Sequence, residues 1–270
     1  MKALLLNFAD EEEEFTRCLQ RLGCTVTLNP AWEQGVDAAF VHTLRSLSEV
    51  SPYIHALCHL FVQRHTLSPE GLLQLEKLVA EAGVKLQFSA LPLYEWRIFD
   101  AKLLVGEVKF VQVYSDFEYD KPLSAKDLCA EALAVAGVVK AKLSKAERLR
   151  ATVPHSANLL GLRTDFVNAA SAYFWLSSAA FSARRELRLF GSSGVAAVDV
   201  LKREVSVKTL DGKATSMPFL SKAESREREI ADFAAALHGK EQPAISAAEA
   251  TVQQEIVQRS QLGIAQDLGM

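Results

Sequence analysis

Apolar and polar positions follow two different patterns along the chain, and the pattern changes near Gly106. In the first part, short apolar runs predict strands at residues 2–8, 25–28, 37–42, 60–63 and 84–88. Amphipathic stretches at residues 10–22 and 69–82 predict helices, each followed by a glycine of the kind that ends helices. Strands that alternate with helices pair in parallel through right-handed crossovers. The first part therefore predicts an α/β domain with a parallel sheet.

Beyond Gly106, alternation at period two predicts strands joined by short turns such as Gly191-Ser192-Ser193-Gly194. These strands are residues 107–117, 138–143, 165–176, 185–190, 195–200 and 204–210, and helices at residues 224–237 and 247–260 close the chain. The predicted fold class is α/β plus α+β. A shortened Rossmann-like domain spans residues 1–95, and residues 96–270 form a domain with a large, mostly antiparallel sheet and both closing helices.

The composition supports a substantial core and excludes some partners. The 270 residues are 49% hydrophobic and 23% charged, with a net charge of −3, which favours neither nucleic acid nor an anionic membrane. Four cysteines without a CxxC pair predict reduced, mostly buried thiols and a cytoplasmic protein. The uncharged stretch 166–183 contains Asn168 and four serines, so a buried strand plus a turn is predicted there instead of a membrane helix.

The first predicted turn carries acids where a phosphate site would need glycines. Asn7, Phe8 and Ala9 lead into five acidic residues, 10–14, and no glycine precedes Gly23. Asp10 is placed to cap the following helix and Glu13 has capping-box spacing, so the helix supplies its own anions. A pyrophosphate at this turn would meet side chains and like charge.

Three stretches resemble one known family. They are CHLFVQRHTLSPEGLLQLEKLVAEAGVKLQFSA (residues 58–90), RRELRLFGSSGVAAVDVL (184–201) and EREIADFAAALHGKEQPAISAAEATVQQEIVQRS (227–260). Together and in this order they resemble the glucose–fructose oxidoreductase / inositol dehydrogenase (Gfo/Idh/MocA) family. The resemblance implies an NAD(P)-binding Rossmann domain, a sheet domain that often mediates dimers, and hydride transfer on sugars, polyols or similar small molecules.

The chain departs from that family where the cofactor would bind. By position alone, the residues that would line the cofactor site are Asn7, Phe8, Asn29 and His42. Asn29 stands where an acid or arginine usually reads the adenosine ribose; it could reach a hydroxyl group, or it could serve only as a turn former before Pro30. The short segment before residue 37 also indicates that one strand–helix unit is missing.

The family's acid–base positions differ as well. The resemblance aligns Gln63-Arg64-His65 with a Glu-Lys-Pro element, and Arg64 could anchor an anion but not exchange a proton. It also aligns Asp127 and Glu131 with an Asp-x-x-x-His element. Glu131 could be a general base, a member of an ion pair (Arg64 with Glu131 or with Asp127), or a solvated carboxylate.

Other candidate sites are weaker, and two functions stay open. His55 and His59 lack a third ligand, so we expect no metal. Tyr173, Phe174 and Trp175 predict core or a dimer interface, or else a ligand pocket. The favoured function is a homodimeric pseudoenzyme without a cofactor, in a binding, regulatory or partner-subunit role with a possible small-molecule ligand. The alternative is an active NAD- or NADP-dependent oxidoreductase with an unusual cofactor site.

Overall fold

The computed structural model describes residues 1–8, 11–28, 35–118, 125–149, 159–180, 182–239 and 243–267. The chain divides into two compact units. Unit 1 comprises Met1–Leu91 and Ser221–Thr251, and unit 2 comprises Pro92–Leu220 and Val252–Met270. The first of the two closing helices lies in unit 1, and the second begins in unit 1 and continues into unit 2.

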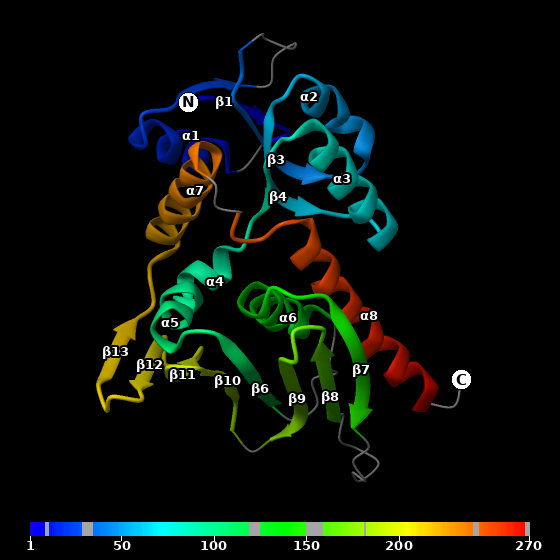
Figure 1. Cartoon of the computed structure of the whole chain (residues 1–270), viewed down its shortest axis with the longest axis vertical. Helices are drawn as coiled ribbons and strands as arrows, with labels where there is room; N and C mark the ends of the chain where they lie inside the picture. The colour runs from blue at the N-terminus through cyan, green and yellow to red at the C-terminus, as the bar shows by residue number, and fades with distance from the viewer. Residues whose placement is uncertain are drawn as a thin grey trace. The chain divides into compact units, whose positions relative to one another are not determined.

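Unit 1 is built on a parallel sheet with the order β2-β1-β3-β4-β5 (Figure 1). Its strands are β1 (Lys2–Leu6), β2 (Thr25–Leu28), β3 (Ala38–Leu44), β4 (His59–His65) and β5 (Leu86–Phe88). Its helices are α1 (Glu12–Arg21), α2 (Ser51–His55), α3 (Pro69–Ala82) and α7 (Lys222–His238), with a 3-10 turn, η1, at Leu47–Glu49. All five predicted strands are confirmed. The sheet has the shortened form that the sequence predicts.

Successive side chains of a strand point to opposite faces of the sheet, and those on the face covered by α1 and α7 form a core. Phe40 and Phe61 lie side by side on that face, and Phe15 from α1 and Phe233 from α7 pack against them. Helices α2 and α3 lie on the other side of the sheet (Figure 1). Helix α7 begins with a capping box between Ser221 and Glu224. The core of unit 1 therefore requires a helix that the chain supplies only after the first segment of unit 2, Pro92–Leu220.

Unit 2 is built on a sheet with the order β13-β12-β11-β10-β6-β9-β8-β7. Its strands are β6 (Val108–Glu118), β7 (Leu143–Leu149), β8 (Leu159–Phe166), β9 (Ser171–Ala180), β10 (Arg184–Gly191), β11 (Gly194–Asp199), β12 (Glu204–Thr209) and β13 (Ala214–Pro218). All neighbours are antiparallel except β6 and β9, which are parallel. The predicted fold class is confirmed in both units.

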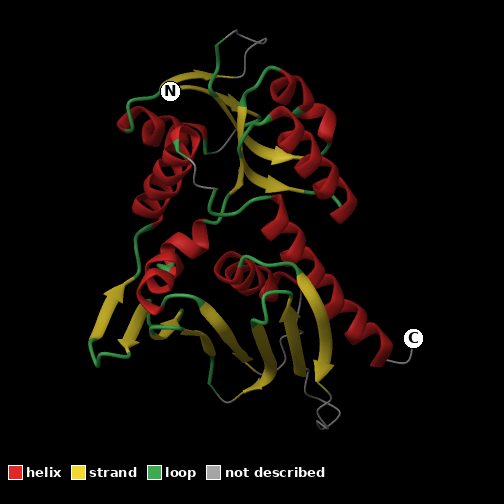
Figure 2. Ribbon diagram, viewed as in Figure 1, coloured by secondary structure: helices red, strands yellow, loops and turns green. Residues whose placement is uncertain are grey.

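Helices cover one face of this sheet and leave the other open. The remaining helices are α4 (Leu91–Glu95), α5 (Ile98–Val105), α6 (Ala125–Val139) and α8 (Ala247–Asp267). Helix α5 packs on β10, β11 and β12, and α6 packs on β6. Figure 2 shows these helices on a single side of the sheet, and no helix of the described residues lies on its other face.

Two predicted elements of unit 2 were wrong in detail. Residues 138–143 were predicted as a strand, but Val138 and Val139 end helix α6. The error has a physical cause: α6 is buried on nearly all sides from Leu128 onward, so its apolar pattern has no helical period. Residues 165–176 are not one strand but the end of β8, a turn and the start of β9. The predicted strand plus turn within 166–183 is confirmed.

Candidate functional site

One cluster of polar and charged side chains in unit 1 lies at the carboxyl ends of its parallel strands. The chain runs from β1 to β2 on one side and then returns to β3 on the other, so β1 and β3 flank the point where the strand order reverses. Ligands of open α/β sheets bind outside the strand ends at such a point. The turn after β1, the end of β4 and the first part of α7 supply the residues considered next.

The Phe8 side chain lies at the turn that follows β1. Asn7 has a left-handed backbone with φ of 60°, which asparagine tolerates better than most residues. The Phe8 ring packs on Phe15 at 4.7 Å between centroids and lies edge-on to the His42 ring at 5.3 Å. His42 is further held by Thr43, whose Oγ1 is 3.1 Å from Nδ1. These side chains occupy the place that glycines would leave open.

Glu11, the N-cap residue of α1, does not cap the helix with its side chain. Its carboxylate accepts hydrogen bonds from Gln63 Nε2 and, at 3.1 Å, from Arg226 Nη2. Lys222 Nζ lies 3.7 Å away and Arg64 Nη2 4.0 Å away. Burial alone would raise the pKa of Glu11, but the Gln63 hydrogen bond and the charges of Arg226 and Lys222 outweigh it and lower the pKa.

The predicted position of the N-cap was wrong by one residue: the N-cap is Glu11, so capping-box spacing falls on Glu14 and not on Glu13. Glu13 is exposed and pairs with Arg17 at 3.9 Å. Asp10, the predicted N-cap, lies outside the described residues, as does Asn29. The general expectation that the helix supplies an anion at this turn holds, because Glu11 provides it.

Arg226 is a buried cation. Its side chain is 1% exposed, its guanidinium lies 4.2 Å from the centroid of the Phe15 ring, and its Nε is 3.8 Å from Glu14 Oε1. Its Nε and Nη1 have no hydrogen-bond partner among the described residues. Since buried donors are usually satisfied, this arginine is held at the strand ends with unused hydrogen-bonding capacity.

The residues aligned with Glu-Lys-Pro have separate roles. Gln63 binds Glu11, while Arg64 is 65% exposed and only distantly paired with Glu11. The His65 ring packs on Phe88 at 4.8 Å, and burial lowers the pKa of its imidazole. None of these side chains is a lysine that could exchange a proton near neutral pH.

A second buried ionisable side chain on α7, Glu229, holds the end of β5. Glu229 accepts hydrogen bonds from the Ala90 N–H and, at 3.1 Å, from the Ser89 hydroxyl. Burial raises the pKa of this carboxyl to about 7, although the Ala90 hydrogen bond and the charge of Arg226 oppose the increase. Glu229 thereby fixes the segment that precedes the boundary with unit 2.

Glu131 in unit 2 belongs to an ion pair. It is fully buried in α6, where its Oε1 accepts a hydrogen bond from Arg185 Nε at 2.6 Å and another from the Ser115 hydroxyl at 3.4 Å. The Arg185 guanidinium also lies 5.2 Å from the centre of the Trp96 ring. Asp127 lies in the first turn of α6, and its side chain is outside the described part of the structure. The predicted pairing of Arg64 with Asp127 or Glu131 stays a prediction.

Sequence reasoning missed Glu11, Arg226 and Glu229 as site residues. A signal for Arg226 was present: Arg226, Ile230 and Phe233 share one face of a helix at spacings of four and three residues. An arginine on the apolar face of a helix needs a buried partner. Its partner Glu11 is 215 residues away in the chain, so no local pattern could identify it.

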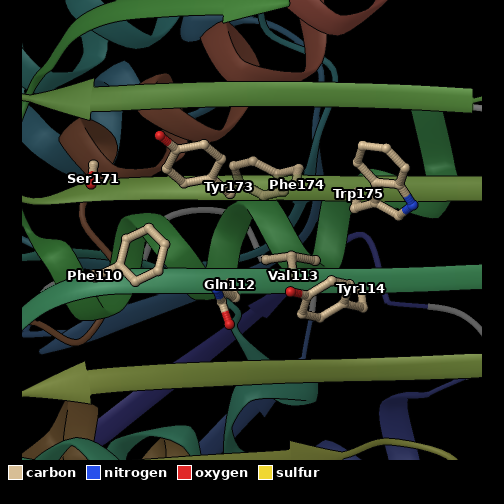
Figure 3. Close-up of a pocket in the computed structure, with 8 residues that line it drawn as sticks. All are labelled: Phe110, Gln112, Val113, Tyr114, Ser171, Tyr173, Phe174 and Trp175. Carbon is tan, nitrogen blue, oxygen red and sulfur yellow. The ribbon is translucent and has the colours of Figure 1, made fainter. Parts of the chain in front are cut away.

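The open face of the unit 2 sheet carries the second candidate site. A shallow pocket of about 600 Å³ lies between β6 and β9 (Figure 3). The residues around it are Phe110, Gln112, Val113, Tyr114, Ser171, Tyr173, Phe174 and Trp175. Phe174 and Val113 are buried toward the core, so Tyr173 and Trp175, on alternate positions, face outward. We call the outward-facing Phe110, Tyr114, Tyr173, Trp175 and Phe190 the aromatic face.

Arginines accompany this aromatic face. The Arg184 guanidinium lies 4.3 Å from the centre of the Tyr114 ring, and that of Arg163 lies 5.6 Å from the centre of the Tyr173 ring. The carboxylate of Glu186 receives hydrogen bonds from Arg184 and Arg188. Aromatic residues and arginine are the types enriched where proteins associate.

Neither a metal centre nor a membrane helix is found in the described residues. No group of three histidine, cysteine, aspartate or glutamate side chains there could hold a metal ion. No helix described is long and apolar enough to cross a membrane. Cys18, Cys24 and Cys58 are buried thiols outside any disulfide, as their spacing predicts.

Comparison with known proteins identifies the fold. The chain matches no known protein-family model and no curated protein sequence. Among solved structures it is similar to UDP-N-acetylglucosamine 3-dehydrogenase from Acidithiobacillus ferrooxidans, with 14% identity, a TM-score of 0.69 and 97% of each chain covered. It is also similar to a dehydrogenase from Chromobacterium violaceum, with 10% identity, a TM-score of 0.65, and 99% of this chain and 96% of that one covered.

A third similar structure contains a cofactor. It is an oxidoreductase from Agrobacterium radiobacter in complex with NAD⁺, L-tartaric acid and magnesium, with 12% identity, a TM-score of 0.72, and 98% of this chain and 96% of that one covered. The chain thus has the two-domain fold of Gfo/Idh/MocA-type oxidoreductases. The resemblance seen in the sequence is confirmed at the level of the fold.

Proposed function

We propose that this protein keeps the oxidoreductase fold without its dinucleotide chemistry, and acts in the cytoplasm as a homodimeric binding, regulatory or partner subunit. One observation carries the proposal. The carboxylate of Glu11, held by Arg226 and Gln63, stands at the turn after β1. In open α/β folds of this kind that turn receives the cofactor's pyrophosphate.

The residues present do not fit a dinucleotide. Phe8 covers the turn, and the cations that could neutralise a pyrophosphate are already paired with Glu11 and Glu14. Each unit charge brought to contact with a like charge costs about 1 kcal/mol in water and several-fold more where water is partly excluded. Micromolar binding amounts to about 8 kcal/mol, so loss of the phosphate contacts removes much of what would hold the cofactor.

The acid–base groups also argue against hydride chemistry. Arg64 stands where the resembling family has a lysine, and a guanidinium does not replace lysine as an acid–base group. Glu131 is buried against Arg185. A general base must reach the proton it removes. Neither side chain offers a group that can take a proton from an alcohol bound at the strand ends.

The aromatic face supports association with a second copy. It lies on the open side of the sheet and combines aromatic rings with paired arginines. Exposed apolar surfaces of this kind are usually covered by a partner. A sheet face that meets its own copy forms a symmetric interface, the commonest arrangement in soluble oligomers.

Calorimetry with NADH and NADPH tests the loss of the cofactor. We expect no saturable heat for either at sub-millimolar concentration. A tight 1:1 complex with either cofactor would contradict the proposal and favour the alternative, an active NAD(P)-dependent oxidoreductase acting on a sugar, polyol or other small molecule.

A further inference from the structure

We infer that Glu11 is a tethered anion that closes a phosphate-binding site formed by Gln63, Arg64, Lys222 and Arg226. The ligand class is inorganic phosphate or a phosphate monoester. This inference rests on the proposed function, because a bound dinucleotide would need the same turn. It adds that one side chain, Glu11, closes the site, and that replacing Glu11 by an uncharged residue opens it.

The strongest support is Arg226. The side chain is 1% exposed, and its Nη2 is directed at Glu11 from 3.1 Å. Its Nε and Nη1 find no hydrogen-bond partner in the described part of the chain. Packing against the Phe15 ring fixes the guanidinium, so little conformational entropy is lost when it binds an anion. A phosphate has more acceptor oxygens than a carboxylate and can use donors that Glu11 leaves unused.

Donors from separate elements converge on the same carboxylate. Gln63 and Arg64 come from the end of β4, and Lys222 and Arg226 come from the first two turns of α7. All four lie within 4.0 Å of a Glu11 oxygen. Such convergence on a single carboxylate is the arrangement expected of an anion site.

The start of α1 does not engage the Glu11 side chain. The Glu11 side chain makes no capping hydrogen bond, because its carboxylate is engaged by Gln63 and Arg226. The first turn of α1 also carries Glu12, Glu13 and Glu14, so acidic side chains already offset the helix dipole at this end. The affinity of the site for an anion therefore comes from the side chains of β4 and α7 and not from the start of α1.

The charges explain why Glu11 closes the site. Arg64, Lys222 and Arg226 carry three positive charges against Glu11 and Glu14, a net of +1. Replacing Glu11 by a neutral residue raises the net to +2 and removes the side chain that competes with a ligand. Glu14 remains 3.7 Å from Lys222 and 3.8 Å from Arg226, so the opened site should bind phosphate with modest affinity.

The test is isothermal titration calorimetry at low salt, in which the full chain is titrated with inorganic phosphate and, separately, with pyrophosphate. The variants are Glu11→Ala, Glu11→Gln and, as the matched control, Glu13→Ala, which removes an exposed acid of the same helix turn. We expect both Glu11 variants to bind phosphate about tenfold or more tightly than the unchanged protein and Glu13→Ala. Adding Arg226→Met to Glu11→Ala should abolish the gain.

The possible outcomes separate this inference from the proposed function. If circular dichroism shows that Glu11→Ala does not fold, Glu11→Gln, which keeps the shape of the side chain, decides the test. Equal phosphate binding by the unchanged protein and both Glu11 variants, or a gain that survives Arg226→Met, overturns the inference. Binding of NADH by the unchanged protein overturns the proposed function, whatever the phosphate titrations show.

Discussion

At the scale of single residues, the buried charges of α7 decide how unit 1 responds to its surroundings. Arg226 and Glu229 lie one helical turn apart, and both face the ends of the parallel strands. One is paired with a carboxylate from α1, and the other holds backbone and hydroxyl donors after β5. The contributions of the two residues to stability can therefore be measured separately.

Removal of Arg226 should destabilise the protein through its partner. Arg226→Met keeps the apolar contact with Phe15 but leaves the Glu11 carboxylate, which is 20% exposed, with fewer cations. We expect a loss of about 1–3 kcal/mol in the free energy of unfolding, measured by urea denaturation. Adding Glu11→Gln should recover part of it, since the unpaired charge is then gone.

The matched control is Arg17→Met, in an exposed pair with Glu13. Its effect should stay within about 0.5 kcal/mol. An Arg226→Met variant as stable as this control would show that the buried pair contributes nothing.

Glu229 should make stability fall as pH rises. Its pKa is raised from 4.5 to about 7 in the folded protein, so the folded state holds a proton that the unfolded state has lost. Its contribution is fully present below pH 4.5 and is lost as pH rises through 7. Arg226 and Asp232 are the charged groups that face it. We expect Glu229→Gln to remove this part of the pH dependence.

The measurement is the free energy of unfolding of both proteins across that pH window, compared as a difference. Glu11 has a lowered pKa and works in the opposite direction, but it is present in both proteins and cancels. Parallel curves for the two proteins would show that Glu229 does not titrate in this window.

At the scale of elements, the turn between β10 and β11 is held by close approach to α5. A Cβ added at Gly191 would lie 2.2 Å from the Val105 carbonyl oxygen and 2.8 Å from its carbonyl carbon, both backbone atoms that cannot move alone. We expect Gly191→Ala to cost about 1–3 kcal/mol in thermal or urea unfolding.

Gly71→Ala is the control for that substitution. Gly71 lies in the first turn of α3, where a Cβ would meet nothing nearer than 3.4 Å. Alanine there should be neutral or stabilise by up to about 1 kcal/mol. Equal effects at the two glycines would contradict the role assigned to Gly191.

The same scale shows what the sequence could and could not predict. Strands β1, β3, β4 and β5 are largely buried apolar runs, and Gly83 ends α3 in the left-handed conformation that glycine favours, so local pattern was sufficient for these elements. Helix α6 was partly read as a strand because it is buried on nearly all sides from Leu128 onward. The Glu11–Arg226 pair joins residues 215 positions apart, and only the fold brings them together.

At the scale of the whole molecule, the expected assembly is a homodimer through the aromatic face. Trp175 is 38% exposed beside Tyr114 and Tyr173. Trp175→Glu places a charge there, and we expect it to convert a dimer into a monomer in light scattering at micromolar concentration. Leu210→Glu is the control, because Leu210 is 81% exposed beyond the end of β12. A monomeric mass for the unchanged protein would contradict the assembly.

The discontinuity of unit 1 has a consequence for synthesis. Residues 1–91 leave the ribosome long before residues 221–251, yet Ile230 and Phe233 of α7 complete their core. In unit 1, Phe15, Phe40 and Phe61 therefore stay incompletely covered while the strand-rich segment Pro92–Leu220 is synthesised. A chain truncated after Leu220 lacks α7 and so cannot complete the core of residues 1–91. During synthesis, this N-terminal segment needs protection from aggregation until α7 has been made.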